Sequence, residues 1–213
     1  MTERPSTRGR EHDYLPAMGR DRLLPLYDPF TRLVGVPRVH RRLALNAAVE
    51  PGHRVLEIGC GTGNLALRVQ RMHPAADVVG LDPDPLALAR ARRKAERAGL
   101  PVRWHQGTGG ELPCPDESLD RVLSAFMFHH LDEAEKHRML TEVRRVLRPG
   151  GQLHLADFGG HHHGLAGRWV HRNEHLRANA GDGIPARMRD AGFTDVRTGE
   201  RGHLGVLHVR ATR

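Results

Sequence analysis

The ten residues VLEIGCGTGN, at positions 55–64, constrain the fold more than any other part of the chain. An apolar run ends in three glycines within five positions, and a helical pattern, NLALRVQRM, begins at once at residue 64. A short apolar run bounded by glycine predicts a buried strand. A strand that passes through a glycine loop into a helix is typical of open α/β sheets, where ligands bind outside the carboxyl ends of the strands.

Strand and helix patterns continue to alternate along the chain. This alternation predicts an α/β fold with a doubly wound, seven-stranded, mostly parallel sheet covered by helices on both faces, and an antiparallel C-terminal strand at the end of the sheet. Strands are expected at 53–58, 77–82, 102–107, 119–126 and 152–158, helices at 64–72, 83–99, 132–151 and 184–192, and a closing hairpin at 193–199 and 202–212.

Two of the expected helices carry clear local signals. In 83–99, one face is apolar and Gly99 supplies a stop. In 132–151, Asp132 and Glu135 form a capping-box pattern, and Pro149-Gly150 is expected to end the helix. The predicted buried stripes are Leu88, Ala91, Ala95 and Ala98 in the first helix and Met139, Val143, Val146 and Leu147 in the second.

The chain divides into three expected parts. Residues 1–13 are polar and aperiodic, which predicts a disordered arm; 14–50 predict a helical cap with a helix near 37–49; and 51–213 predict the main domain. Within the last part, 159–183 lacks a clean period and is expected to be a substrate-side insertion. The first residues lack a secretory apolar segment and no run of about 18 apolar residues exists, so we expect a cytoplasmic protein without a membrane span.

The charge of the chain is strongly basic. Its 33 basic residues include only two lysines, Lys94 and Lys136, and the formal net charge is +8. Such an arginine bias often reflects genome composition, so it is weak support for a nucleic-acid partner. The two cysteines, Cys60 and Cys114, fit neither a CxxC pattern nor a disulfide framework.

The glycine loop itself excludes two common ligands. A dinucleotide fingerprint needs a third glycine where Asn64 stands, and no Gly-Lys-Ser/Thr phosphate loop is present. Glu57 at the strand end would also repel a pyrophosphate and favour a cationic group. Asp82 ends the next strand, where a carboxylate can accept both hydroxyls of a ribose. S-adenosylmethionine fits, because it is a phosphate-free nucleoside with a sulfonium and an ammonium.

Four blocks in order resemble one protein family: VLEIGCGTGN, VVGLDPDP, ELPCPDESLDRVLSAFMFHHL and EVRRVLRPGGQLHLADF. The chain is similar, over roughly residues 25–210, to class I S-adenosylmethionine-dependent methyltransferases. It resembles most the small-molecule branch that includes the ubiquinone/menaquinone biosynthesis enzymes. The resemblance implies methyl transfer from S-adenosyl-L-methionine to a small-molecule acceptor.

The resemblance also implies the cofactor contacts. The methionine part would lie on the loop, the ribose on Asp82, the adenine near Pro83, and backbone groups at the end of the fourth strand would approach the cofactor. One departure stands out: the family usually has Gly-Asp-Ala after the third strand, and here Thr108 replaces the Asp, which weakens the expected adenine contact. The implied residues are Glu57, Gly59, Cys60, Gly61, Gly63, Asp82, Pro83, Gly107, Thr108, Ser124 and Ala125.

Methyl transfer is an in-line displacement, so it needs alignment and needs a base only if the acceptor starts protonated. His129 and His130, just past the fourth strand, are the candidate bases, with capping of the next helix as the alternative role. Asp157 either contacts substrate or is a solvated strand end. The histidines at 161–163, 171 and 175 lack partner ligands, so we expect no metal site.

Two other functions stay open. A nucleic-acid methyltransferase fits the charge, but the Asn/Asp-Pro-Pro-Tyr/Phe tetrapeptide is absent after the fourth strand, and aromatic platforms for a flipped base are few. A homologue that binds the cofactor without turnover is the second alternative, to which Thr108 gives slight support. The acceptor atom and the oligomeric state do not follow from the sequence.

Overall fold

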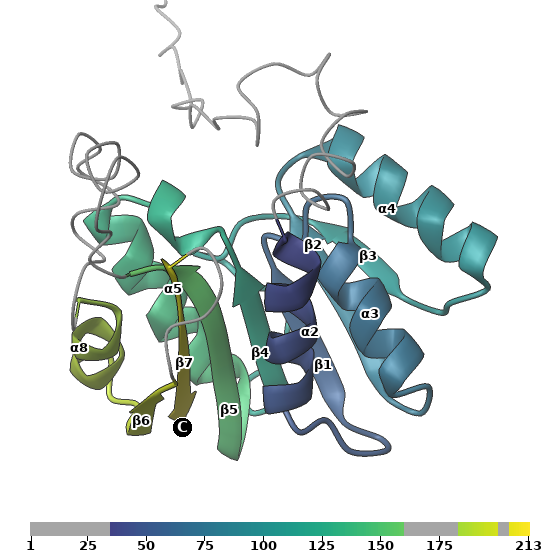
Figure 1. Cartoon of the computed structure of the whole chain (residues 1–213). Coiled ribbons are helices and arrows are strands. Elements are labelled where there is room, and N and C mark those ends of the chain that lie inside the picture. Colours follow the sequence, from purple (N-terminus) through teal and green to yellow (C-terminus); the bar gives the residue numbers. More distant parts are fainter. Residues whose placement is uncertain (1–34, 160–182, 200–204) are drawn as a thin grey trace, which may run out of the picture.

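The structure, a computed structural model, describes residues 35–159, 183–199 and 205–213. These residues form a seven-stranded sheet with helices on both faces (Figure 1). The strands are β1 (Arg54–Ile58), β2 (Asp77–Asp82), β3 (Arg103–Gln106), β4 (Leu119–Ala125), β5 (Leu147–Phe158), β6 (Thr194–Thr198) and β7 (Val206–Thr212). The helices are α2 (Val36–Asn46), α3 (Asn64–Met72), α4 (Pro85–Ala98), α5 (Glu133–Val146) and α8 (Gly183–Asp190), with a 3-10 turn, η2 (Phe128–His130).

The strand order is β3-β2-β1-β4-β5-β7-β6. Strands β1 to β5 pair in parallel, and β7 is antiparallel to both β5 and β6. The predicted fold class and the antiparallel C-terminal strand are therefore confirmed. We predicted that the antiparallel strand lies at the end of the sheet. Instead, β7 is inserted between β5 and β6, and β6 forms the edge.

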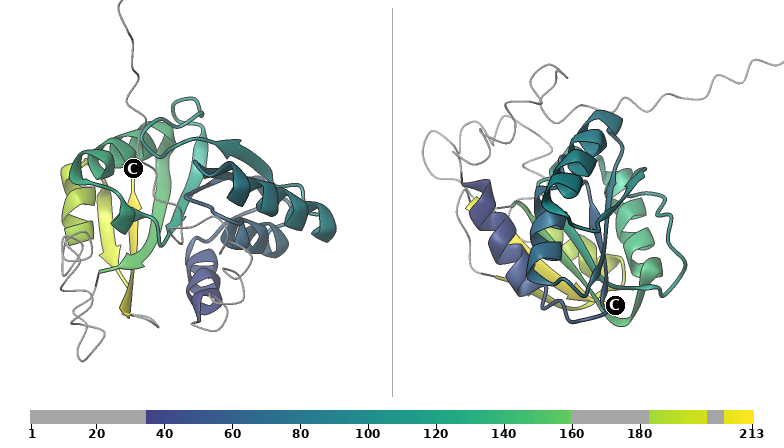
Figure 2. Two further views of the ribbon diagram at one scale, coloured as in Figure 1. Left: turned by 90° about the horizontal axis from the view of Figure 1, so that it is seen from above. Right: turned by 90° about the vertical axis from the view of Figure 1, so that its right-hand side faces the viewer.

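Each face of the sheet buries its own apolar core. Alternate residues of a strand point to opposite faces, so Val55 packs with α2 and α3 while Leu56 and Ile58 pack with α5 and α8. Helices α2, α3 and α4 cover one face, and α5 and α8 cover the other (Figure 2). This two-sided burial explains why the strands read as continuous apolar runs rather than as alternating ones.

The predicted helix signals hold with two corrections. Asp84 caps α4, and Asp132 and Glu135 form the predicted capping box of α5. Ala98, predicted to be buried, is exposed in the last turn of α4. Helix α5 ends at Val146 rather than at Pro149-Gly150, because Leu147 becomes extended and pairs with Leu119 of β4.

Several predicted segments fall outside the described residues. They are the arm at 1–13, most of the cap at 14–50, the insertion at 159–183 except Gly159 and Gly183, and the histidines at 161–163, 171 and 175. The helix expected near 37–49 is present as α2. In the part of the chain that the structure describes, no helix has the length and apolar character needed to cross a membrane.

Candidate functional site

The candidate site lies where β1, β2 and β4 end. In the strand order, the chain runs outward from β1 to β3 and then returns to β4 on the other side of β1. The neighbouring loops separate at such a switch point and leave a crevice at the carboxyl ends of the strands. Glu57 and Asp82, the two carboxylates singled out from the sequence, are both buried here, at 3% and 5% exposure.

Glu57 holds the start of α3. Its Oε2 accepts a hydrogen bond from the backbone N–H of Ala66 at 2.7 Å, so the carboxylate satisfies one of the orphan donors of the first helical turn. Burial raises the pKa of Glu57 well above its ordinary value, and the nearby charge of Asp82 raises it further. Its Oε1 makes no other hydrogen bond among the described residues. A cationic ligand beside this group would favour its ionised form.

Asp82 ties the glycine loop to β2. Its Oδ2 accepts from the N–H of Gly61 at 2.7 Å, and its Oδ1 accepts from the N–H of Asp84 at 2.9 Å. Burial raises the pKa of Asp82, while these two amides favour the charged form. The contacts bring Glu57 and Asp82, which lie on neighbouring strands, to the two sides of one loop.

The glycines of the loop serve different needs. Gly59 has φ +71°, and a Cβ there would lie 2.4 Å from Cγ of Met127. Both the backbone conformation and the lack of space therefore disfavour a side chain at this position. Gly61 has φ +50°, but a Cβ there would meet no atom of the described residues within 4 Å. The loop is therefore packed on the β4 side and open at Gly61, where a ligand could approach the backbone. Between them, Cys60 is buried, and burial raises the pKa of its thiol well above the usual range.

Lys94 of α4 also holds the glycine loop, although the sequence did not single it out as a site residue. Its ammonium donates to Oγ1 of Thr62 at 3.0 Å and to Oδ1 of Asn64 at 2.8 Å. These contacts fix the end of the glycine loop from the side of the neighbouring helix. One sequence signal could have pointed to this residue: Lys94 is one of only two lysines in a chain whose other basic residues are arginines.

The loop after β3 lies beside Asp82. Gly107 donates its N–H to the carbonyl oxygen of Asp82 at 3.2 Å, and Gln106 donates its side-chain amide to the carbonyl oxygen of Pro83 at 3.2 Å. Thr108, the residue that departs from the family pattern, is exposed. These contacts place Pro83 and Gly107 together at the end of β2.

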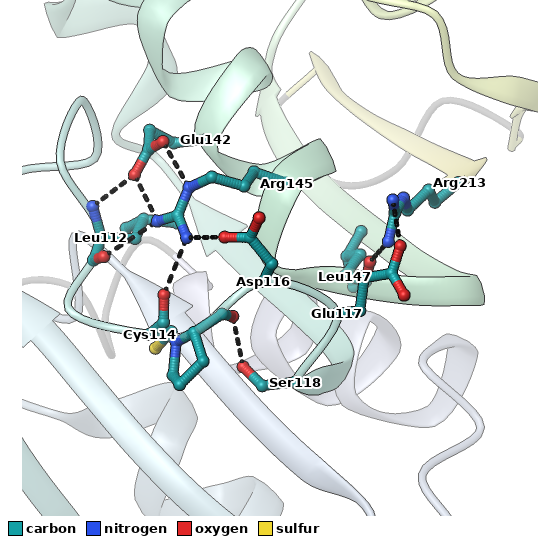
Figure 3. A network of polar contacts seen from close by, with 10 residues as sticks. Leu112, Cys114, Asp116, Glu117, Ser118, Glu142, Arg145, Leu147 and Arg213 are labelled. Atoms are coloured by element: carbon teal, nitrogen blue, oxygen red, sulfur yellow. Dashed lines mark hydrogen bonds and ion pairs between the residues drawn. The ribbon is translucent and has the colours of Figure 1, made fainter.

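The continuation of that loop is held by Arg145 of α5 (Figure 3). The guanidinium donates to the carbonyl oxygens of Leu112 at 3.1 Å and Cys114 at 2.9 Å, and it pairs with Asp116 and Glu142 at 2.7 Å each. The Arg145 side chain thus supplies hydrogen-bond donors to backbone carbonyl groups in a loop that has no regular secondary structure.

The end of β4 is linked to β1 by a side chain and is followed by an uncommon backbone conformation. Ser124 is fully buried and its hydroxyl donates to the carbonyl oxygen of Ile58 at 3.1 Å, so its side chain links β4 to β1. Ala125 is 9% exposed. The next residue, Phe126, has φ +56°, an uncommon conformation for a non-glycine residue. Its ring lies 5.4 Å from the ring of Phe158, between centroids.

His129 and His130 occupy different environments. His129 lies with its Nδ1 2.7 Å from Oδ1 of Asp157, and its backbone N–H donates to the other oxygen of that carboxylate at 3.1 Å. A carboxylate only accepts, so Nδ1 carries a proton, and in the neutral form of the ring Nε2 then has the lone pair. His130 is exposed and its ring lies 3.9 Å from that of His129, between centroids. Asp157, buried at the end of β5, is therefore a partner of His129 rather than a solvated strand end.

Among residues 35–159, 183–199 and 205–213, no three His, Cys, Asp or Glu side chains are grouped to hold a metal ion. The histidines at 161–163, 171 and 175 lie outside these ranges.

A comparison with protein families bears on this arrangement. Residues 55–151 match the methyltransferase domain family, from the first strand through the start of β5. This chain resembles methyltransferases over residues 55–151. Two methyltransferases resemble it closely. Demethylmenaquinone methyltransferase of Thermus thermophilus is 42% identical over 139 residues, which cover 64% of this chain and 62% of that protein. The enzyme of the same name from Deinococcus radiodurans is 38% identical over 148 residues, covering 68% and 61%.

The fold of the methyltransferase domain has close relatives among solved structures. An S-adenosylmethionine-dependent methyltransferase from Aquifex aeolicus superposes with a TM-score of 0.65 at 21% identity, covering 87% of this chain and 97% of that one. The comparisons confirm the resemblance to small-molecule methyltransferases of the quinone-biosynthesis type. The chain spans about three fifths of the length of the two curated relatives.

Proposed function

We propose that this methyltransferase domain transfers a methyl group from S-adenosyl-L-methionine to a small-molecule acceptor. The observation that carries the proposal is the placement of two buried carboxylates, Glu57 and Asp82, around one glycine loop that opens at Gly61. The match to the methyltransferase domain and the names of the relatives support the same assignment.

The residues present fit the cofactor. The free Oε1 of Glu57 and its negative charge suit the cationic methionine part, and the open space at Gly61 lets that part approach the loop. Each oxygen of Asp82 accepts one amide and keeps a second lone pair for a ribose hydroxyl. Pro83 and Gly107 would flank the adenine, with the exposed Thr108 at its edge. Bound there, S-adenosylmethionine would supply a methyl group on a good leaving group.

His129 is the residue that we assign as base. Asp157 holds the ring in one tautomer with Nε2 ready to accept a proton, and it stabilises the cationic ring that results. A base of this kind is useful for an acceptor whose reacting atom starts protonated, such as a ring hydroxyl or an acidic ring carbon. Phe126 and Phe158 beside it provide apolar surface for a flat ring. We therefore favour an aromatic or quinol-type acceptor, in agreement with the names of the relatives.

The experiment starts with binding. Calorimetry on the full chain should show micromolar affinity for S-adenosylmethionine and for its demethylated product, and none for ATP or NAD. Asp82→Asn should weaken this binding at least tenfold. Asp77→Asn, at the opposite end of the same strand and paired to Arg103 on the surface, is the matched control and should leave it unchanged.

Turnover then separates the remaining functions. A short-chain demethylmenaquinol should yield a methylated product and one equivalent of S-adenosylhomocysteine. Tight cofactor binding without methylation of any quinol, phenol or other small acceptor would favour the inactive homologue. Salt-sensitive binding and methylation of RNA or DNA would favour the nucleic-acid enzyme. Uptake of ATP or NAD in place of S-adenosylmethionine would overturn the proposal.

A further inference from the structure

A second site lies on the sheet, away from the ends of β1, β2 and β4. A cavity of about 380 Å³ is present between α2 and the strands β5, β7 and β6. Its size falls within the range of small-molecule sites. Its polar lining consists of Asn46, His154, Arg197, Thr198, His208 and Arg210. None of these residues belongs to the methyl-transfer site described above.

The strand register places positive charge in one row. Arg197 of β6 pairs with Arg210 of β7, and Arg210 pairs in turn with His154 of β5. Directly paired residues on neighbouring strands share a face, so all three lie on the face covered by α2. Like charges directly opposite each other destabilise a sheet, so the pair Arg197 and Arg210 calls for a negative partner.

Among the described residues, one carboxylate serves both arginines as that negative partner. Asp195 pairs with both arginines, at 2.6 Å to Nε of Arg197 and 2.5 Å to Nη2 of Arg210. One carboxylate thus faces two guanidinium groups. Arg42 of α2 adds a third, since its Nη2 lies 3.9 Å from where a Cβ of Gly199 would stand at the cavity wall. Over the residues that the structure describes, the local charge is positive even with Asp195 counted.

Two buried nitrogen atoms belong to residues that line the cavity. Nε of Arg210 and Nδ1 of His208 make no hydrogen bond to any described residue. His208 as a whole is only 4% exposed. A buried polar atom without a partner is unfavourable, and native structures rarely leave one unexplained. Nε of Arg210 can only donate, so an anion in the cavity would supply the acceptor that it lacks, and the anion would also accept from Nδ1 of His208 in the tautomer that protonates this nitrogen.

The two histidines are neutral in this surrounding. Burial lowers the pKa of His154 to about 3, with Arg121 and Arg210 lowering it further. Burial and then Arg42 lower the pKa of His208 to about 4. The histidines therefore act near neutral pH as hydrogen-bonding groups, and the arginines supply the charge.

We propose that this cavity binds a phosphate group, either as the free ion or as a small phosphate monoester. Guanidinium groups match phosphate oxygens in geometry, and a dianion balances the surplus charge better than a single carboxylate does. Asn46 and Thr198 also line the cavity, and their amide and hydroxyl donors complete a donor set from four structural elements. The proposal does not depend on the methyl-transfer function.

The test measures anion binding to the full chain by calorimetry at constant ionic strength. Inorganic phosphate, glycerol 3-phosphate and acetate are titrated separately. We expect saturable binding of one or both phosphates with acetate at least tenfold weaker. If the monoester binds more tightly, the site serves an organic phosphate; if the free ion does, the site serves phosphate itself.

Matched variants locate the binding. Arg197→Gln and Arg42→Gln should each weaken phosphate at least fivefold, and thermal unfolding should show that both variants stay folded. Arg103→Gln is the control. It also removes an exposed arginine from an ion pair, here with Asp77 of the neighbouring strand, but it lies on β3 at the opposite edge of the sheet. Saturating S-adenosylhomocysteine should leave phosphate affinity unchanged. Unsaturable binding, equal acetate binding, an equal loss in Arg103→Gln, or competition with S-adenosylhomocysteine would each overturn the proposal.

Discussion

His129 and Asp157 are held together by two contacts of one carboxylate. One oxygen lies 2.7 Å from Nδ1 of the ring, and the other accepts the backbone N–H of the same histidine at 3.1 Å. The carboxylate is fixed in turn by the N–H of Phe158, which donates to it at 2.6 Å. The two residues are 28 positions apart but meet because β4 and β5 are parallel neighbours that end side by side.

Replacing Asp157 tests this relationship. In Asp157→Asn, the amide can present an N–H to the ring, which would turn the proton-bearing nitrogen of His129 to the wrong side. We expect kcat to fall about 100-fold, within the usual range for losing a positioned base, with unchanged affinity for S-adenosylmethionine. Steady-state kinetics and calorimetry measure the two quantities.

The two histidines serve as matched controls for each other. His129→Ala should lose as much activity as Asp157→Asn, whereas His130→Ala should keep kcat within about threefold of the parent. If His129→Ala turns over the acceptor at the parental rate, alignment alone suffices and our assignment of a base is wrong.

Glu57→Gln is predicted to separate stability from function. The amide oxygen can still accept the N–H of Ala66, but the buried charge is gone. Affinity for S-adenosylmethionine should fall about tenfold, which corresponds to about 1.4 kcal/mol, since the cationic group loses its counter-charge. Calorimetry checks this loss, and equal affinity would remove Glu57 from the cofactor site.

The raised pKa of Glu57 also sets a pH dependence. The folded protein holds this proton at pH values where the unfolded chain has released it, so the contribution of Glu57 destabilises the fold as pH rises from about 4.5 through the folded-state pKa. Glu57→Gln removes this effect. Its Tm should therefore exceed that of the parent by more at pH 8 than at pH 5, as thermal unfolding at the two pH values would show. A gap that narrows as pH rises would contradict the assignment.

Gly59→Ala should destabilise the fold by about 2–5 kcal/mol. Left-handed backbone costs a non-glycine residue about 1–2 kcal/mol, and overlap with Met127 adds about 1–3 kcal/mol. Urea unfolding measures the total. Gly61→Ala is the control: its φ is also positive but its Cβ would meet open space, so only the backbone part of the loss should remain.

A double-mutant cycle isolates the steric part. In a Met127→Ala background, Gly59→Ala should cost about 1–3 kcal/mol less than in the parent. No coupling between the two positions would show that Met127 moves aside freely, and that the backbone conformation alone demands glycine.

Arg145→Gln should lower the free energy of unfolding by about 2–3 kcal/mol, because the carbonyl group of Cys114 loses its side-chain donor and that of Leu112 loses one of its two donors (Figure 3). The loop should also open more often, so Cys114 should react faster with a thiol reagent. Arg144→Gln, which removes a single exposed hydrogen bond to Gly192, should change each quantity much less. Equal effects of the two variants would reject a special role of Arg145.

The sequence determined the parts of this protein that depend on neighbouring residues. Apolar runs predicted the strands, and the glycines after β1 marked the loop because glycine adopts the positive φ of Gly59 and Gly61 without strain. The capping box of Asp132 and Glu135 fixed the start of α5. The same local reading placed Glu57 and Asp82 at strand ends, and parallel pairing then brought them together.

Only the tertiary structure decided the rest. The end of α5 was misplaced because pairing with β4, not local propensity, pulls Leu147 into a strand. The contact of Lys94 with Thr62, the pair His129 and Asp157, and the row Arg197, Arg210 and His154 depend on which strands and helices become neighbours and in which register. Residues far apart in the chain carry no mutual signal in one sequence, so their partnership exists only once the sheet has formed.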